Sequence, residues 1–402
     1  MATPGSSSSS SAAAAEKSAF VLVENLKHEF EWYAFNISDD VEVNKPPPSI
    51  LHYSIWKDFH QDHGSKAVVK FKPPSATVKI EEEELGHCWA ILGLEDNKKK
   101  TIYRICFEDQ MFQLTEDKAV VKSVGRLSRA DVLTSDPTGK TMWESLDSMP
   151  NYLSYLNAHI VPLSDKVYCL GGLTEVNHDQ SPWAMSYDRR LEAWQCLPDP
   201  PRLPKGGLVD GIFSTSATLG IGSTSSTAPR LCIVVGLPQQ GLIQFYYADT
   251  GEWVEEEFRC CRFFHPKDLC GKPVAVGNTL YWYVVGTKLL GGYDLQTKTW
   301  SVGHIAIHDD WDYVKDDNGY KDPPPSLAHI GGDMFCLLWV SPQVPIQIMD
   351  ISRIHCMKFR VTAAATNGCP DEGIIPVEAT ILSCQYYFIS GGSKTYCDGL
   401  VV

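Results

Sequence analysis

The 402-residue chain lacks the features of a membrane or exported protein. No apolar run approaches the roughly 18 residues that a membrane-spanning helix needs. The N-terminus is rich in Ser and Ala, its first basic residue is Lys17, and no arginine precedes Arg104. A signal peptide has basic residues ahead of an apolar stretch, and a transit peptide is rich in arginine. We therefore expect a cytoplasmic or nuclear protein with no membrane partner.

An excess of basic charge is also absent, because 35 Lys and Arg residues stand against 49 Asp and Glu residues, a net charge of −14. Nucleic-acid binding needs a basic surface, so no nucleic-acid partner is expected. None of the 13 cysteines forms a Cys-x-x-Cys pair. A disulfide scaffold would hold a far larger share of cysteine, so we expect reduced thiols.

Long stretches with helical periodicity are missing as well. The chain contains instead short apolar runs of about six residues, separated by Gly, Pro, Asp and Asn, a pattern that predicts an all-β fold. Clear examples are Val167–Leu170, Leu231–Val235, Leu280–Val285 and Phe335–Trp339. Residues 1–18 are of low complexity and are expected to be a disordered tail, which leaves 19–402 as the folded domain.

The apolar runs belong to a repeat in which Gly-Gly, Tyr-Asp and Trp follow at similar intervals. The signature positions are Gly171, Gly172, Tyr187, Asp188 and Trp194 in the clearest copy, Tyr293, Asp294 and Trp300 in a second, Trp253 in a third, Trp143 in a fourth, and Gly391 and Gly392 near the C-terminus. The interval from Tyr to Trp is seven residues in the first two copies.

Each part of the repeat has a physical interpretation. An apolar run ending in Gly-Gly suits an inner strand followed by a turn with positive φ. Tyr-Asp opens a tight turn whose backbone the Asp side chain caps. The Trp, expected to be buried at Trp194, Trp300 and Trp143, returns on the next strand and covers the adjacent sheet. One such sheet cannot bury both faces, so several must stand around an axis.

At these residues the chain resembles the kelch family of β-propellers. The resemblance implies six blades, with the C-terminal run Tyr386–Gly392 completing the N-terminal blade; seven blades is the alternative. It also implies a monomeric, non-catalytic interaction module that binds a protein partner through loops at one face. Kelch proteins often add an F-box or BTB domain, and neither is expected here.

The alternative function is a kelch-scaffold metalloenzyme, or a specifier protein, with ligands assembled on the ring axis. Specifier proteins of this family resemble one another in a Glu-x-x-x-Asp-x-x-x-His run, which this sequence lacks. His87, His159 and His329 come before predicted inner strands in three units and would face one mouth of the ring. We expect them to line a wet axis, with no catalytic residue, no cofactor and no metal site.

Other local patterns favour loops over chemistry. Gly139-Lys140-Thr141 has Thr134 where a phosphate-binding loop needs glycine. Gly220-Ile-Gly222 has no third glycine and is expected in a loop between sheets. His304 and His308 would lie about 13 Å apart on a strand, too far to share one ion, and the acidic run 309–322 is expected to be solvated.

Three short charged runs complete the sequence pattern. They are Glu81–Glu84, Lys98–Lys100 and Glu255–Glu257. All three are expected to be solvated loop ends, with a docking role as the alternative.

Overall fold

A computed structural model provides the structure of the protein. It describes residues 17–25, 30–37, 87–96, 99–115, 118–131, 144–148, 159–171, 182–202, 212–219, 230–269, 272–284, 287–305, 325–341, 351–364, 374–390 and 394–401. Strands make up most of these ranges, and their helices are the 3-10 helices η2 (Pro238–Gln240) and η3 (Pro266–Leu269). The predicted all-β class is confirmed. None of the helices in these ranges is long and apolar enough to cross a membrane.

Three four-stranded antiparallel sheets follow one another along the chain, and in each the strand order is the chain order. The first contains β3 (His87–Asp96), β4 (Lys99–Thr115), β5 (Lys118–Asp131) and β6 (Glu144–Ser148). The second contains β7 (His159–Leu163), β8 (Lys166–Leu170), β9 (Ala184–Asp188) and β10 (Ala193–Cys196). The third contains β11 (Phe213–Leu219), β12 (Arg230–Leu237), β13 (Leu242–Tyr247) and β14 (Glu252–Glu257).

An eight-stranded sheet follows, built from two meanders of four strands. One contains β15 (Val274–Val276), β16 (Thr279–Val284), β17 (Leu289–Asp294) and β18 (Trp300–His304). The other contains β19 (Ser326–Gly331), β20 (Met334–Ser341), β21 (Ile351–Ala363) and β22 (Ile374–Ser390). They join where β18 pairs in parallel with the start of β22. Gly303 lies at this join, and a Cβ there would come within 2.5 Å of the Val377 carbonyl oxygen.

The two ends of the described chain meet in one sheet. β1 (Lys17–Asn25) pairs with β2 (Phe30–Ile37) on one side and with β23 (Lys394–Val401) on the other. The C-terminal run was predicted to supply this strand, but Tyr386–Ser390 belongs to β22 and pairs with β21. The pairing partner of β1 therefore lies one strand later. β1 also includes the last two residues of the predicted tail.

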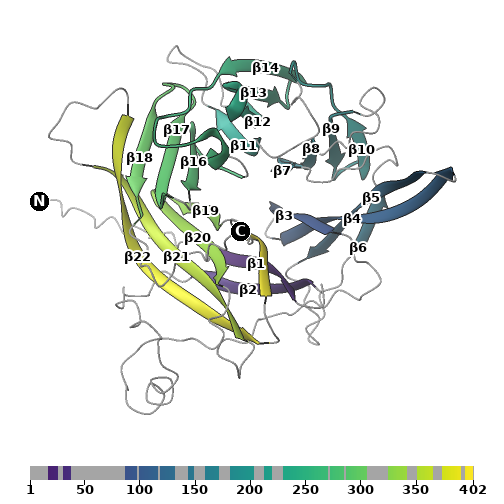
Figure 1. Ribbon diagram of the computed structural model, residues 1–402, viewed down its shortest axis with the longest axis horizontal. Coiled ribbons are helices and arrows are strands. Elements are labelled where there is room, and N and C mark those ends of the chain that lie inside the picture. The colour runs from purple at the N-terminus through teal and green to yellow at the C-terminus, as the bar shows by residue number, and fades with distance from the viewer. Residues whose placement is uncertain are drawn as a thin grey trace, which may run out of the picture.

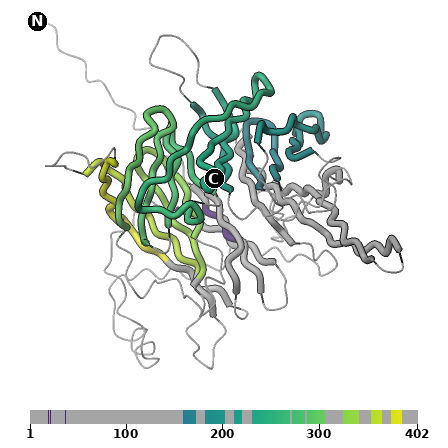
Figure 2. Tube along the Cα trace, turned by 45° about the horizontal axis from the view of Figure 1, so that its top comes forward, coloured from purple at the N-terminus to yellow at the C-terminus, as the bar shows by residue number. Residues whose placement is uncertain are grey.

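The sheets stand around a common centre (Figure 1), and Figure 2 shows the arrangement of β7 to β22 from a tilted view. One edge strand of each meander contacts the corresponding strand of the next. The series is β3, β7, β11, β15, β19 and β23, and β23 in turn contacts β3. We call these the inner strands. This closed series of contacts gives the described sheets a ring-like order.

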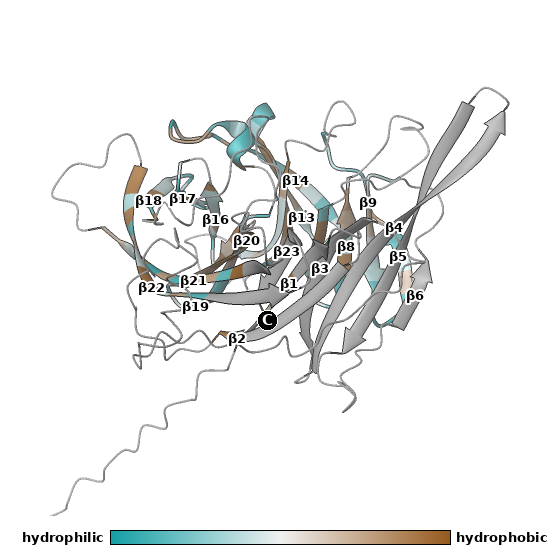
Figure 3. Ribbon diagram, turned by 60° about the horizontal axis from the view of Figure 1, so that its bottom comes forward, coloured by the Kyte–Doolittle hydropathy of each residue, from teal (hydrophilic) through white to brown (hydrophobic). Residues whose placement is uncertain are grey.

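The apolar runs occupy the second strand of each meander, not the inner strand as predicted. β8, β12, β16 and β20 are covered on both sides within their own sheets, and their faces pack against neighbouring sheets. Val167, Ile233, Leu280 and Leu337, one from each strand, are fully buried. Figure 3 colours the residues by hydropathy, with hydrophobic stretches of the strands in brown. A strand that is paired on both edges and packed on both faces has no solvent-facing side, which accounts for its continuous apolar run.

The predicted Tyr-Asp turns are confirmed. Asp188 accepts hydrogen bonds from the backbone N–H groups of Arg190 and Leu191 at 2.9 and 3.2 Å. Asp294 accepts the equivalent bonds from Gln296 and Thr297 at 2.9 and 2.7 Å. Both carboxylates therefore cap the turn between the third and fourth strands.

The glycines of the repeat differ from copy to copy. Gly171 has the expected positive φ, +68°, and donates its N–H to the Trp183 carbonyl at 2.9 Å. Gly291 and Gly292 lie within β17, where a Cβ on Gly291 would come within 2.6 Å of the Phe264 ring. The signature positions Gly172, Gly391 and Gly392 lie outside the described residues.

The signature tryptophans share a register but not an environment. Trp194, Trp253 and Trp300 each pair with the Tyr seven residues earlier on the preceding strand. Trp300 is 5% exposed, whereas Trp194 is half-buried, so the predicted burial of Trp194 was wrong. Trp143 lies outside the described residues.

Two of these indoles connect their sheet to the chain that leaves the preceding sheet. The Trp300 Nε1 donates to the Arg259 carbonyl at 2.7 Å, and the Trp253 Nε1 donates to the Pro198 carbonyl at 2.8 Å. Arg259 follows β14, and Pro198 follows β10. The outermost strands are therefore fixed to their neighbours by indole hydrogen bonds.

Candidate functional site at one mouth of the ring

Polar side chains meet where three inner strands begin. His159 is the first residue of β7, and its Nδ1 lies 3.0 Å from the Oγ of Ser214, the second residue of β11. Ser214 is buried, and the bond joins two neighbouring sheets. Lys272 is exposed, lies two residues before β15, and acts electrostatically on His159. We call His159, Ser214 and Lys272 the axial cluster.

The surroundings of His159 keep its imidazole neutral. Desolvation by the packed strands, with a smaller contribution from the Lys272 charge, lowers the pKa of His159 to about 4. At neutral pH the ring therefore carries no charge and forms one hydrogen bond with the Ser214 hydroxyl. A base with so low a pKa is poorly matched to proton abstraction near pH 7. The axial cluster is suited to hydrogen bonding, with the Lys272 ammonium as its cation.

His159 and His329 lie at opposite ends of the inner strands. β18 runs parallel to β22. Within each meander the first and fourth strands run in opposite directions, so β15 is antiparallel to β18 and β19 is antiparallel to β22. β15 and β19 are therefore parallel to each other. The axial cluster is at the start of β15. His329 lies toward the end of β19, with its Nε2 3.0 Å from the Gly332 carbonyl oxygen in the following turn. The expectation that these histidines face one mouth was wrong.

The other residues that the sequence analysis weighed as metal ligands, and expected not to be ligands, fall partly outside the described residues. His87 begins β3, and its side chain lies outside the description. His304 ends β18 and is exposed, while His308 and 309–322 lie outside the described residues. Among the side chains that the structure describes, no group of three or more His, Cys, Asp or Glu is arranged to hold a metal ion. The regions 134–141 and 220–222 also lie outside it.

The connection from β14 to β15 reaches the same mouth. Phe258, Phe264 and Leu269 anchor it in the core. The His265 N–H donates to the Asp268 Oδ2 at 2.9 Å, and the Asp268 N–H donates to the His265 carbonyl at 2.8 Å. These reciprocal bonds close the turn that precedes β15.

This anchored connection presents an aromatic residue to solvent. Phe263 is 43% exposed, and the Arg262 guanidinium carbon lies 5.3 Å from its ring centroid. We call residues 259–265 the Phe263 loop. No prediction from the sequence covered this loop. The His265-Pro266-Lys267-Asp268 turn ahead of a strand was the available signal.

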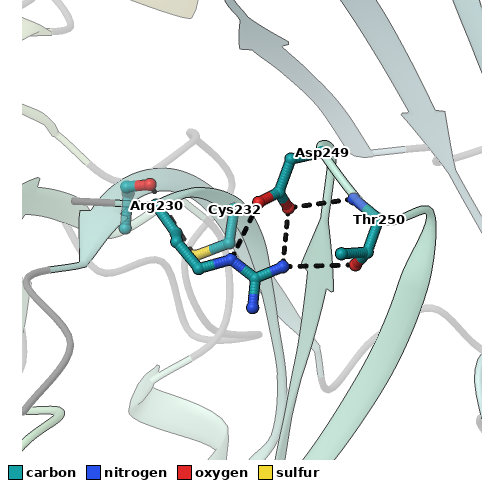
Figure 4. A network of polar contacts seen from close by, with 5 residues as sticks. Arg230, Cys232, Asp249 and Thr250 are labelled. Atoms are coloured by element: carbon teal, nitrogen blue, oxygen red, sulfur yellow. Dashed lines mark hydrogen bonds and ion pairs between the residues drawn. The ribbon is translucent and has the colours of Figure 1, made fainter. Parts of the chain in front are cut away.

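The hairpin turns at the opposite face use their charges locally. Arg230 begins β12 and donates to the two carboxylate oxygens of Asp249 at 2.9 and 2.6 Å and to the Thr250 Oγ1 at 3.2 Å (Figure 4). Lys166, which begins β8, pairs with Asp188 at 3.3 Å. A basic residue at the start of the second strand therefore holds the turn between the third and fourth strands in two sheets.

The glutamate run Glu255–Glu257 lies within β14, so its prediction as a loop end was wrong. Its ion-pair partners are Arg202 for Glu255 at 3.2 Å, Lys298 for Glu256, and Arg259 for Glu257 at 2.8 Å. Arg202 follows β10 and Lys298 precedes β18, so the pairs connect β14 to both neighbouring sheets. Each such exposed ion pair contributes little to the stability of the fold. Lys99 and Lys100 are likewise strand residues, in β4.

No family model matches the chain, and no curated protein matches it. Among solved structures, the crystal structure of AztD from Citrobacter koseri aligns over 94% of this chain and 99% of that chain, with a TM-score of 0.28 and 8% identity. The apo AztD structure from the same organism gives the same values. A likeness at this level identifies neither a family nor a function.

Proposed function

We propose that the chain is a six-bladed β-propeller of the kelch type that acts as a monomeric, non-catalytic protein-interaction module. Support for six blades comes from the inner strands, which contact one another in a closed series with one strand from each of six meanders or terminal groups. The blade with β1 and β2 takes its inner strand, β23, from the C-terminus. Support for the kelch type comes from the capped Tyr-Asp turns and the common register of the tryptophans.

The Phe263 loop carries the proposal of an interaction module. Phenylalanine and arginine side chains are enriched at the cores of protein–protein interfaces relative to the rest of the protein surface. Phe263 and Arg262 are presented by a connection whose flanking residues are buried and hydrogen-bonded, so little conformational entropy is lost on binding. Lys272 of the axial cluster lies further along the same connection, ahead of β15. We assign partner binding to this mouth of the ring.

The proposal includes a cytoplasmic or nuclear location, which rests on a cysteine content too low for a disulfide scaffold. Every cysteine whose side chain the structure describes is unpaired. Cys336 and Cys356 lie on neighbouring strands with their sulfurs 3.4 Å apart and no bond between them.

Affinity capture with the intact chain tests the interaction module. The bait is compared with a Phe263→Ala/Arg262→Ala variant and with a Leu191→Ala control, since Leu191 is 65% exposed in the β9–β10 turn at the opposite face. We expect mass spectrometry to find proteins that the control retains and the Phe263 variant loses. Identical sets with all three baits would contradict binding at this mouth.

Removal of β23 tests the propeller. Deleting residues 394–402 takes away the strand that pairs with β1 and contacts β3 and β19. We expect loss of cooperative unfolding across the whole chain, because closing one blade from both termini makes the ring a single unit. A truncated chain with native-like melting and solubility would rule out this closure.

A further inference from the structure

Two cysteine thiols lie in contact on neighbouring strands of the sheet that ends with β22. Cys336 on β20 and Cys356 on β21 are both buried, and their Sγ atoms are 3.4 Å apart. Cys336 pairs in register with Lys358, and Cys356 with Leu338, so the two thiols are diagonal neighbours on one face of the sheet. A disulfide bond is about 2.05 Å long, so the two sulfurs need to move only about 1.4 Å closer to be joined. We call Cys336 and Cys356 the thiol pair.

A buried lysine lies beside the thiol pair. Lys358 is 5% exposed and stands directly opposite Cys336, so both side chains leave the same face of the sheet. The hydrogen bond with Cys356 and desolvation raise the pKa of Cys336 well above its ordinary value, while the Lys358 ammonium acts in the opposite direction. The thiolate is the form that attacks a disulfide. The buried pair is therefore unreactive, and once water reaches it Lys358 remains to favour the Cys336 thiolate.

The sheet that covers the thiol pair is the one that contains both ends of the described chain, β1, β2 and β23, which we call the terminal sheet. Ala19 and Val21 of β1 and Ile37 of β2 belong to the same apolar cluster as Cys336 and Cys356. β23 also contacts β20, and Figure 1 shows β1 next to β20. Local opening concentrates at chain termini. Opening of the terminal sheet would therefore uncover the thiol pair while β20 and β21 stay paired.

The other cysteines nearby provide internal controls. Cys384 of β22 stands opposite Met357, and both pack on the other face of the sheet. Cys169 and Cys232 are fully buried within the second and third four-stranded sheets. These three thiols share the strand environment of the thiol pair but not its contact with the terminal sheet.

We propose that Cys336 and Cys356 form a reversible disulfide when the terminal sheet opens, with a low-molecular-weight disulfide as the oxidant. The Cys336 thiolate attacks one sulfur of the oxidant, breaks its S–S bond and releases one thiolate. The Cys356 thiolate then attacks the Cys336 sulfur of this mixed disulfide, which joins the two cysteines and releases the second thiolate. The released thiolates take up the two protons that the cysteines lose, so the oxidant gains two electrons and becomes two thiols. This inference goes beyond the proposed interaction function and does not depend on it.

Glutathione buffers test the proposal on the intact chain. The chain is incubated at increasing ratios of oxidised to reduced glutathione, the remaining thiols are alkylated, and mass spectrometry measures the cross-link between the tryptic peptides that contain Cys336 and Cys356. We expect the cross-link to increase with the ratio and to disappear when dithiothreitol is added. Cys356→Ser is expected to retain one glutathione on Cys336, because no second thiol displaces it. Cys384→Ser is expected to form the cross-link as the natural chain does.

Matched substitutions test the roles of the terminal sheet and of the lysine. Val21→Ala removes two methyl groups from the cover over the thiol pair and is expected to speed cross-link formation about tenfold. Val234→Ala makes the same change at an equally buried position of β12 and is expected to leave the rate unchanged. Lys358→Met keeps an aliphatic stem without the charge and is expected to shift the pH–rate profile of cross-linking to higher pH. Circular dichroism checks that each variant is folded.

Several outcomes would overturn the proposal. One is the absence of the cross-link at every glutathione ratio, in the natural chain and in Val21→Ala alike. Another is a cross-link that dithiothreitol does not reduce in the folded chain, which would identify a structural disulfide instead of a reversible one. Equal acceleration in Val21→Ala and Val234→Ala, with Cys169 and Cys232 alkylated at the same rate as the thiol pair, would mean that the bond forms only after global unfolding. An unchanged pH–rate profile in Lys358→Met would contradict the role given to the lysine.

Discussion

The sheets β7–β10 and β15–β18 carry the two clearest copies of the repeat, yet they place equivalent residues in different environments. Trp194 and Trp300 hold the same register opposite Tyr187 and Tyr293. Trp300 is buried and Trp194 is half-buried. Two neighbours contribute to the difference. The connection after β14 packs the rings of Phe258 and Phe264 against Trp300 at centroid distances of 5.9 and 5.5 Å, and β22 pairs its Ile374 with Trp300. The repeat determines the register, and the connections between sheets determine burial.

The two sheets also differ from each other at their inner and outer edge strands. At the inner edge, β7 begins with the polar His159, while Val274 and Val276 of β15 pack on an apolar cluster. At the outer edge, β18 is joined to β22, whereas no described strand covers β10. Each difference comes from a residue or strand outside the repeat. The following predictions test these differences in order of expected size.

Truncation of the two tryptophans is expected to give unequal losses. Trp300→Ala should lower the free energy of unfolding by about 3–5 kcal/mol, as is usual for large aromatic residues in a core. Trp194→Ala should cost about 1 kcal/mol, because solvent already reaches the ring. Urea denaturation of both variants measures the comparison. Equal losses would mean that the connection after β14 does not determine burial.

Acid is expected to weaken the inner edge of β7. His159 has a pKa of about 4 in the folded chain and an ordinary value of 6.5 when unfolded, so the unfolded chain binds more protons between these limits. The free energy of unfolding therefore keeps its full value above pH 6.5. It falls by up to about 3 kcal/mol as the pH drops toward 4. Denaturant titrations across this range compare the natural chain with His159→Gln. A pH dependence unchanged in the variant would place the titrating group elsewhere.

The outer join is expected to be sensitive to a single methyl group. Gly303→Ala places a Cβ within 2.5 Å of the Val377 carbonyl oxygen and should cost about 1–3 kcal/mol, the range for overpacking. His304→Ala, at the next and exposed position, serves as the control and should be nearly neutral. Thermal melting of both variants provides the measurement. A neutral Gly303→Ala would indicate that β22 can move away from β18.

Local features of the fold could be predicted from the sequence, and non-local ones could not. The apolar runs and the Asp caps depend on residues close together in the chain. The His159–Ser214 bond joins residues 55 positions apart, and β23 reaches β1 across almost the whole chain. The length of β4 and β5 was missed because polar and apolar residues do not alternate regularly along them, so periodicity gave no strand there. The apolar runs were placed at the axis because burial on both faces does not distinguish a second strand from an innermost one.

The smallest expected effect is one that the two sheets share. Asp188→Ala and Asp294→Ala each remove a carboxylate that accepts two backbone hydrogen bonds in an exposed turn. Each should cost about 1 kcal/mol, because water replaces part of the lost hydrogen bonding at an exposed site. Asp188 also pairs with Lys166 at 3.3 Å, so a Lys166→Ala/Asp188→Ala double-mutant cycle separates the ion pair from the cap. If the cap is the common element, the losses of unfolding free energy in Asp188→Ala and Asp294→Ala are equal after the Lys166–Asp188 coupling energy is subtracted from the Asp188→Ala loss. A large remaining difference would mean that the turns, like the tryptophans, depend on their surroundings.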